Sequence, residues 1–340
     1  MKRIIFLLVA FLLFAGCAQQ AYLILPETPE AAVQESAREP LQVVTTIFPQ
    51  FDFIRQIAGD RVELTMLISP GAESHSFEPT PRDMVTLHNA DLLIYVGGHS
   101  ETWVHPVLNS LEREDMRTVA ILGLIDDLLE VHYDHSNHHH DHDNHHHDHS
   151  NHHHDYSNHH HDHEIHLDEH IWTSPQNAAL IIEALAEVLS EMDPTNSYFY
   201  RENAAAYIQE IMDLDQAFAD VVAQGIRNTI VFGDRFPFRY LAHAYNLTYY
   251  AAFDGCSSET QASPARVAFL IEKVQNENIP VVFYIEFSDR AIANVIEEAT
   301  GARLLKLHSI HNVSHSDFTA GVTYLELMLQ NLEQLRKALS

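Results

Sequence analysis

Histidine is the residue type whose number and spacing point most directly to chemistry. The chain has 340 residues, of which 27 are histidine, and 19 of these fall between residues 132 and 170. Within that tract the sequence Asn-His-His-His-Asp recurs, beginning at Asn137, Asn144, Asn151 and Asn158. Neutral imidazoles beside carboxylates bind Zn²⁺, Cu²⁺ and Ni²⁺ in many weak, exchanging arrangements. The tract therefore indicates metal collection or sensing, or else an expansion with no selected role, and it assigns no single ligand.

A sharper set of candidate ligands follows the predicted strands. Ligands of open α/β sheets bind beyond the carboxyl ends of the strands, so side chains placed there can meet in one crevice. His75 lies in a loop bounded by glycine and proline after the second strand, and His170 directly precedes a helix start. Asp234 follows the first strand of the second half, while His308 and His311 follow the last strand. Several such groups, contributed independently, can converge in one cleft between two lobes.

Four other residues have weaker claims. His99 and Glu101 follow the third strand, where they either orient a ligand histidine or lie in a solvated loop. Glu286 ends an apolar strand, and a buried acid needs a partner, so we expect a structural role for it rather than metal ligation. Cys256 is either a ligand or, as a lone buried thiol, inert.

The elements that must position these residues alternate along both halves of the chain. Strands alternating with helices of this length predict parallel sheets with helices on both faces, and two such halves predict two α/β lobes. The predicted strands are 43–48, 62–68, 91–96 and 118–124, then 229–232, 248–253, 281–287 and 304–307. The predicted helices are 51–59, 81–90 and 102–114, then 236–245, 263–277, 289–300 and 316–338.

A long helical region separates the two halves. Ser174 and Pro175 predict a helix start, with serine at the cap and proline just inside it. A second pattern runs over 196–224 without glycine or proline, and a helix of that length measures roughly 43 Å. We therefore expect an α/β fold of two lobes, each a mainly parallel sheet flanked by helices, joined by a long rigid interlobe helix.

The N-terminus and the charge bear on location and partners. Lys2 and Arg3 precede an apolar run that is too short to span a bilayer but suits a signal peptide. The run ends before Cys17 in a pattern similar to a bacterial lipobox, so Cys17 is the expected lipidation site; the alternative is an ordinary secretory signal. With 19 basic and 48 acidic residues the formal charge is −29, which argues against nucleic-acid binding.

Several short motifs stand in order along the chain. They are Ile47-Phe48-Pro49, PGAESHSFEPTP at 70–81, Asp91-Leu92, DEHIWTSP at 168–175, Glu286 and Thr300-Gly301-Ala302. Together they resemble the metal-binding solute receptors of ABC importers for zinc and manganese, the ZnuA/TroA-like family, over about residues 41–340. A His-rich loop at this place is a mark of the zinc-type members.

The resemblance implies a ligand set. The first two family ligands fall on His75 and His170, and the fourth falls at or near His308. The third belongs to a His-Asp-Ala-Phe motif that here reads Gly-Asp-Arg-Phe from Gly233, so the histidine is missing and Asp234 matches the aspartate that follows it. We infer a rearranged site of His75, His170 and His308, completed by His311, Asp234 or water. Three neutral imidazoles favour Zn²⁺ over Mn²⁺.

The implied function is that of an extracytoplasmic, lipid-anchored zinc receptor rather than an enzyme. It would act as a monomer that delivers metal to an ABC permease, and a manganese receptor or a His-rich metal store or sensor at the cell surface are the alternatives. The H-x-x-E-H spacing of His166 to His170 matches a zinc protease motif, but it emerges from the polar tract before the helix begins. The implied organisation is a signal peptide 1–16, a tether 17–40, a first lobe 41–174 with a disordered His-rich loop 132–166, a helical region 175–226 and a second lobe 227–340.

Overall fold

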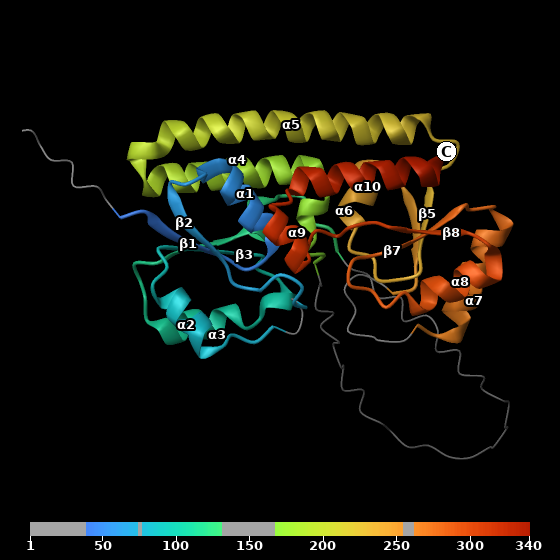
Figure 1. Cartoon of the computed structure of the whole chain (residues 1–340), viewed down its shortest axis with the longest axis horizontal. Coiled ribbons are helices and arrows are strands. Elements are labelled where there is room, and N and C mark those ends of the chain that lie inside the picture. The colour runs from blue at the N-terminus through green and yellow to red at the C-terminus, as the bar shows by residue number, and fades with distance from the viewer. Residues whose placement is uncertain (1–38, 74–76, 131–166, 254–261) are drawn as a thin grey trace, which may run out of the picture. The chain divides into compact units, whose positions relative to one another are not determined.

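Two four-stranded parallel sheets form the centre of the fold. The structure is a computed structural model that describes residues 39–73, 77–130, 167–253 and 262–340. The first sheet has the order β2-β1-β3-β4 and the second the order β6-β5-β7-β8, and neighbouring strands in both run parallel (Figure 1). The strands are β1 (Leu41–Thr45), β2 (Val62–Met66), β3 (Leu92–Tyr95), β4 (Arg117–Ala120), β5 (Thr229–Phe232), β6 (Thr248–Ala251), β7 (Val281–Tyr284) and β8 (Arg303–Lys306).

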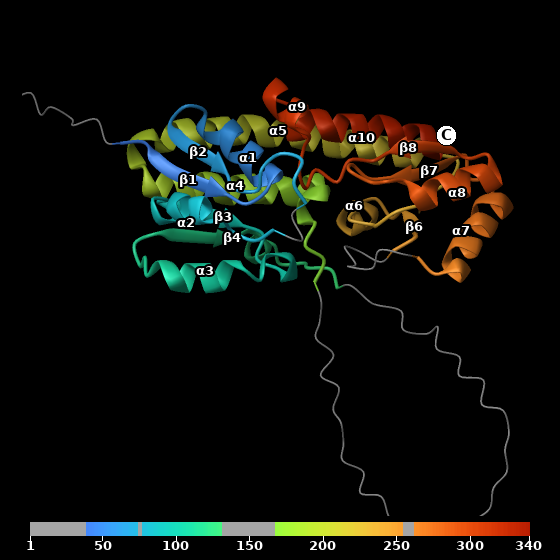
Figure 2. The same ribbon diagram turned by 60° about the horizontal axis from the view of Figure 1, so that its bottom comes forward.

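Helices cover both faces of each sheet, and the alternation of side chains along the strands explains why. In β1, Val43 packs in the core beneath the long helices, while its neighbour Val44 packs on the opposite face. Helices α2 and α3 cover that opposite face of the first sheet, and α7 and α8 cover the corresponding face of the second (Figure 2). The bounds are α2 (Pro81–His88), α3 (Val104–Leu111), α7 (Pro264–Asn276) and α8 (Ala291–Thr300).

The other faces of the two sheets share one continuous apolar core. This core joins Ile94 of the first sheet and Phe283 of the second to residues of α4 (Pro175–Met192), α5 (Ser197–Gln224) and α10 (Tyr324–Leu339). Helix α5 has 28 residues, about 42 Å at 1.5 Å per residue, and extends along both lobes in Figure 1. A single packed layer therefore connects the lobes, which confirms the expected long interlobe helix.

The start of α4 follows from local chemistry. The Ser174 side chain accepts a hydrogen bond from the Asn177 N–H, and Pro175 occupies the first helical turn. This satisfies an amide that the helix itself leaves unpaired, while proline has no amide to satisfy. The predicted helix start is thus confirmed, and it lies four residues after His170.

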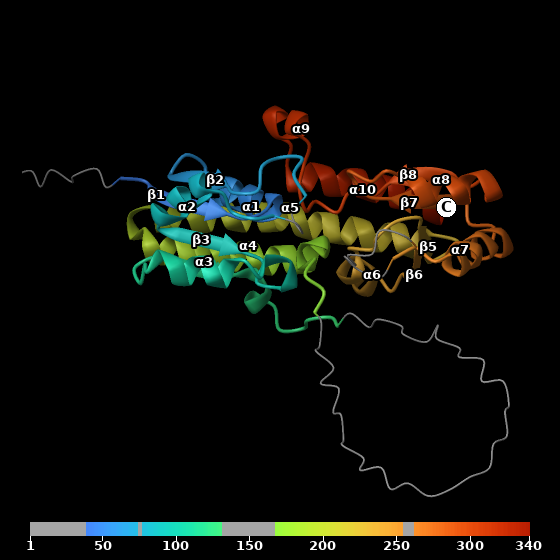
Figure 3. The ribbon, with the colours of Figure 1, turned by 90° about the horizontal axis from the view of Figure 1, so that it is seen from below.

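The chain returns to the first lobe after β8. Helix α9 (His315–Ala320) projects from the body of the protein beside the start of α10 (Figure 3), and its Phe318 ring centroid lies 5.1 Å from that of Phe51 in α1 (Phe48–Ala58). The Tyr324 amide then donates to the buried carboxylate of Asp52 at 2.6 Å. Residues 309–324 therefore pack on the first lobe although they follow the last strand of the second.

The structure corrects two element predictions. Strand β1 stops at Thr45 and Phe48 opens a helix, because Pro49 cannot pair in a sheet and the Gln50 side chain accepts from the Thr46 and Ile47 amides. The expected helix 316–338 is two helices, because Gly321 adopts φ +77° and Thr323 caps α10. The remaining helix is α6 (Arg239–Ala244).

Some expectations concern residues outside the described ranges. The signal peptide, the lipidation site Cys17, the ligand His75, the tract 132–166 and Cys256 all lie there. Across the described ranges, none of the helices combines the length and apolar character needed to cross a bilayer.

Asp52 generates a prediction about stability. Its carboxylate is fully buried and accepts bonds from Arg55, the Tyr207 hydroxyl and the Tyr324 amide, which joins α1, α5 and α10. Asp52→Ala leaves the buried Tyr207 hydroxyl and Tyr324 amide without this acceptor, so we expect the free energy of unfolding to fall by about 2–4 kcal/mol in urea titrations. Glu187→Ala, which removes a surface partner of Arg201, is the control and should change it little; equal losses would contradict the assignment.

Candidate metal site

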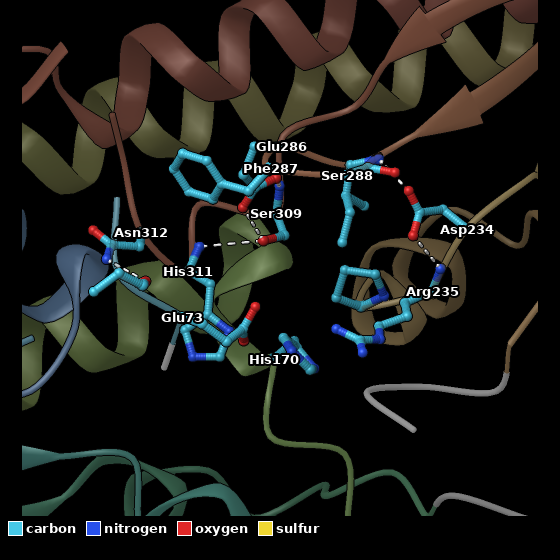
Figure 4. A pocket seen from close by; sticks show the side chains of 13 residues that line it. Glu73, His170, Asp234, Arg235, Glu286, Phe287, Ser288, Ser309, His311 and Asn312 are labelled. Atoms are coloured by element: carbon cyan, nitrogen blue, oxygen red, sulfur yellow. Dashed lines mark hydrogen bonds between the residues drawn. The ribbon is translucent and has the colours of Figure 1, made fainter. Parts of the chain in front are cut away.

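A cavity of about 100 Å³ opens where the carboxyl ends of the two sheets face each other. Its walls come from five segments: the loop after β2, the residues before α4, and the loops after β5, β7 and β8 (Figure 4). In the second sheet, β5 and β7 are the neighbours at which the strand order reverses, and such switch points are where α/β sheets bind ligands. His170, His311 and Asp234 line this cavity, so three of the five candidate ligands reach one place.

His170 is held in the orientation that a metal ligand needs. Its ring Nδ1 lies 3.0 Å from Asp168 Oδ1, and the same oxygen accepts the His170 backbone N–H at 2.9 Å. A carboxylate at Nδ1 holds the proton there and leaves Nε2 as the metal-binding nitrogen. This contact of Asp168 was not predicted from the sequence, although the residue opens the DEHIWTSP motif and stands two positions before the predicted ligand His170.

Asp168 remains ionised although it is buried. Burial alone would raise its pKa, but the charge and hydrogen bonds of His170, with the charge of Arg239, bring the pKa below its ordinary value. The Arg239 Nε lies 3.5 Å from Asp168 Oδ2. The Tyr240 hydroxyl also donates to the Asp168 carbonyl at 3.0 Å. Two residues of helix α6, in the second lobe, therefore hold Asp168 in place, and Asp168 in turn orients His170.

His311 faces His170 across the cavity wall. The two ring centroids are 5.5 Å apart at 82°, and the Trp172 ring lies 5.2 Å from that of His311. His311 is 9% exposed and His170 is 2% exposed, so both imidazoles are largely withdrawn from water. Two imidazoles in this relation can contribute to one metal ion together with further ligands.

His308 does not line the cavity. Its Nδ1 accepts the Ile310 N–H at 3.0 Å, and Asn331 bonds both its backbone N–H and its carbonyl. Ile310, which lies between the two histidines, has φ +64°; His308 is buried away from the cavity, whereas His311 lines it. The structure therefore brings together His170 and His311, and it leaves His308 in the packed interior.

The carboxylates of the two acidic candidates, Asp234 and Glu286, accept hydrogen bonds from nearby backbone amides. Asp234 accepts from the Arg235 amide at 2.8 Å and from the Ile285 amide at 3.4 Å, and burial raises its pKa. Glu286 accepts from the Ser309 amide at 2.7 Å and from the Ser309 hydroxyl. Both carboxylates line the cavity on the side of the second lobe (Figure 4).

The two candidates that follow β3 do not line the cavity. Glu101 is buried, accepts from the Val96 and Gly97 amides, and has its pKa raised by burial, so it closes the loop after β3. His99 is exposed at the start of the same turn. Glu73, which was not among the predicted site residues, does line the cavity; its place two residues before His75 was the available signal.

The described residues do not complete a metal centre by themselves. Within those ranges, no three His, Cys, Asp or Glu side chains come close enough together to hold an ion. His170 and His311 form a pair, and His75, predicted as a ligand, follows Glu73 by two residues outside the described part of the chain. Within the described ranges the geometry thus supplies two imidazoles, with Glu73, Asp234 and Glu286 lining the same cavity.

Comparison with known proteins gives the family. The profile described as ZnuA, zinc-uptake complex component A periplasmic, matches residues 43–338. The chain belongs to the ZnuA family. It is 30% identical over 311 residues to the zinc-binding lipoprotein AdcA of Streptococcus pneumoniae, covering 89% of this chain and 57% of that protein. It is 28% identical over 329 residues to the high-affinity zinc uptake system protein ZnuA of Bacillus subtilis, covering 97% and 94%.

Solved structures agree with the fold. The Zn(II)-bound ZnuA-like domain of S. pneumoniae AdcA superposes with a TM-score of 0.68 at 28% identity, over 88% of this chain and 99% of that one. The metal-dependent lipoprotein YcdH of B. subtilis gives a TM-score of 0.70 at 25% identity, over 88% and 100%. The chain spans little more than half the length of the whole AdcA protein, and its likeness to AdcA is confined to that protein's ZnuA-like part.

Gly233, where the resemblance predicted that a ligand histidine is missing, lies against α8. A Cβ built on Gly233 would lie 2.5 Å from the Ala293 Cα and 2.7 Å from its amide nitrogen. In the described packing, no side chain fits at this position without moving backbone.

His308 generates a prediction about pH. Burial lowers its pKa below the ordinary value of 6.5, so below that pH the unfolded chain binds more protons than the folded protein. The contribution of neutral, buried His308 to the free energy of unfolding is complete above pH 6.5 and is lost as the pH falls. In urea titrations of metal-free protein, His308→Asn should reduce the fall in the free energy of unfolding between pH 6.5 and 5.5. An unchanged pH dependence would contradict this account.

Proposed function

We propose that this chain is the extracytoplasmic zinc-binding receptor of an ABC importer. The observation that carries the proposal is the pair of buried imidazoles, His170 and His311, at a cavity between the two lobes of a ZnuA-family fold. The zinc-binding names of the relatives support the choice of cargo. Zinc is the transported substrate here, bound reversibly rather than kept as a cofactor.

The proposed ligands are His75, His170 and His311. This set differs from the one inferred from the sequence, because His311 replaces His308 as the third histidine ligand. Glu73, Asp234 or water completes the coordination, and Asp168 orients His170 through Nδ1. Three neutral imidazoles suit Zn²⁺, whereas Mn²⁺ prefers more carboxylate oxygen. Zinc affinity should fall below about pH 6.5, because protons then compete for the imidazoles.

Delivery to a permease follows from the family, and the fold constrains how it happens. Because one apolar core runs beneath both sheets and α5, wide separation of the lobes would expose buried side chains. We therefore propose that release proceeds through the loops at the cavity and a small lobe displacement. The acidic chain would raise the local cation concentration only within about 8–10 Å at physiological salt.

A calorimetric zinc titration tests the ligand assignment. His311→Ala should weaken zinc binding by more than about 100-fold, since losing an outer-sphere partner alone costs about 10- to 100-fold. The matched control is His308→Asn, which removes an imidazole three residues away and should leave zinc affinity nearly unchanged. The reverse order of effects would return His308 to the ligand set and remove His311.

Deletion of residues 132–166 separates the receptor from the alternatives. A receptor should keep tight binding of one zinc per chain after the deletion, with only the weak additional sites lost. A surface store or sensor should lose nearly all binding. Competition between Zn²⁺ and Mn²⁺ in the same protein tests the manganese alternative, which requires Mn²⁺ to bind at least as tightly.

We also propose that Cys17 carries a lipid anchor on the outer face of the cytoplasmic membrane. With the full chain expressed in a bacterial host, Cys17→Ser should move the protein from the membrane fraction to the soluble fraction, because the thiol is the acylation point. Cys256→Ser is the control and should leave the distribution unchanged. Membrane association that survives Cys17→Ser would contradict the anchor and favour an ordinary secretory signal.

A further inference from the structure

The segment that carries His311 is bonded to both lobes. We call residues 308–313 the His311 turn. On the second-lobe side, Glu286 holds the Ser309 amide and hydroxyl, and Asn331 holds both backbone groups of His308. On the other side, the Trp172 indole donates to the Ser309 carbonyl at 2.9 Å, and the Phe48 amide donates to the His311 carbonyl at 3.3 Å.

One side chain in this turn reaches the loop after β2. The Asn312 carboxamide donates from Nδ2 to the carbonyls of both Ser69 and Ala72, each at 2.9 Å. The Gly71 amide donates to the Val313 carbonyl at 2.8 Å, so the contact runs in both directions. Asn312 is 3% exposed, whereas Ser69 is exposed and Ala72 is partly buried, so losing the two bonds costs their bond energy rather than the full penalty of unpaired buried carbonyls.

The backbone of the His311 turn needs such support. Ile310 has φ +64°, a conformation that is unfavourable for a β-branched residue and persists only where the surroundings impose it. His311 lines the cavity, whereas His308 does not. Asn312 lies two residues beyond Ile310, between His311 and the first-lobe loop, and its Oδ1 also accepts the Val313 amide at 2.8 Å.

We propose that Asn312 is a positioning residue for metal binding, which locks the His311 turn onto the 69–72 loop of the first lobe. The proposal rests on the proposed function, because it assumes that His311 binds the metal. Asn312 thereby ties His311, which follows the last strand of the second lobe, to a loop of the first lobe. Glu73, the next residue of the same loop and also a cavity residue, keeps its place relative to His311 by the same bonds.

The test compares Asn312→Ala with wild type in the full chain. Without the two donated bonds the His311 turn is less preorganised, so we expect zinc to dissociate roughly 10- to 100-fold faster, the range typical of lost outer-sphere partners. Dissociation is followed by transfer of zinc to a fluorescent chelator. The visible absorption spectrum of bound Co²⁺ should also change, because it reports coordination geometry and a general loss of stability would not alter it.

Asn203→Ala is the matched control. Asn203 on α5 likewise donates from Nδ2 to a backbone carbonyl, that of Ile57, at 3.0 Å, but it lies outside the cavity lining. It should shift the melting temperature of the metal-free protein while leaving the zinc dissociation rate and the Co²⁺ spectrum unchanged. Equal rates and spectra for wild type and Asn312→Ala would overturn the proposal, as would equal effects of the two substitutions.

A measurement on wild type decides the matter if Asn312→Ala does not fold. In metal-free protein, hydrogen exchange at the Gly71 and Val313 amides should show the same opening free energy, because the linked segments open together. Exchange of Gly71 that is much faster than that of Val313 would overturn the link. If wild type itself binds no zinc tightly, the proposed function fails, whereas the exchange result still reports on the link alone.

Discussion

One apolar layer beneath both sheets governs the geometry of everything built above it. Side chains from both sheets meet α4, α5 and α10 in a single core, so the lobes cannot be treated as two bodies on a flexible linker. Separating them would expose part of that layer to water at roughly 25 cal/mol per Å². The cavity therefore forms between sheet ends whose spacing is set by helix packing.

With the spacing of the sheet ends set in this way, the orientation of each cavity side chain depends on the loops that follow the strands. Asp168 bonds His170 at Nδ1, Glu286 holds Ser309, and Ile310 adopts a positive φ between His308 and His311. Each of these is a short-range effect of one or two hydrogen bonds or one backbone torsion. A rigid frame with adjustable ligand-bearing turns can accommodate a rearranged ligand set, such as one that lacks the histidine at Gly233.

Much of this fold was predictable because its signals are local. Strands and helices alternate with clear hydrophobic periods, and Ser174 with Pro175 specifies a helix start without reference to anything distant. The errors arose where a distant or conformational fact decided the outcome. Gln50 caps α1 against an apolar run that otherwise continues as strand, and nothing in the local sequence distinguishes His311, which lines the cavity, from His308, which does not. The exclusion of a side chain at Gly233 required the position of α8.

The return of residues 309–324 to the first lobe has a consequence for how the molecule assembles. Phe51 and Asp52 of α1 meet Phe318 and the Tyr324 amide, contacts that span most of the polypeptide. During synthesis these partners emerge long after α1, so this part of the first lobe stays unfinished until nearly the whole chain exists. Contacts between residues so distant in sequence slow folding. They also prevent the first lobe from completing its packing before residues 309–324 have been synthesised.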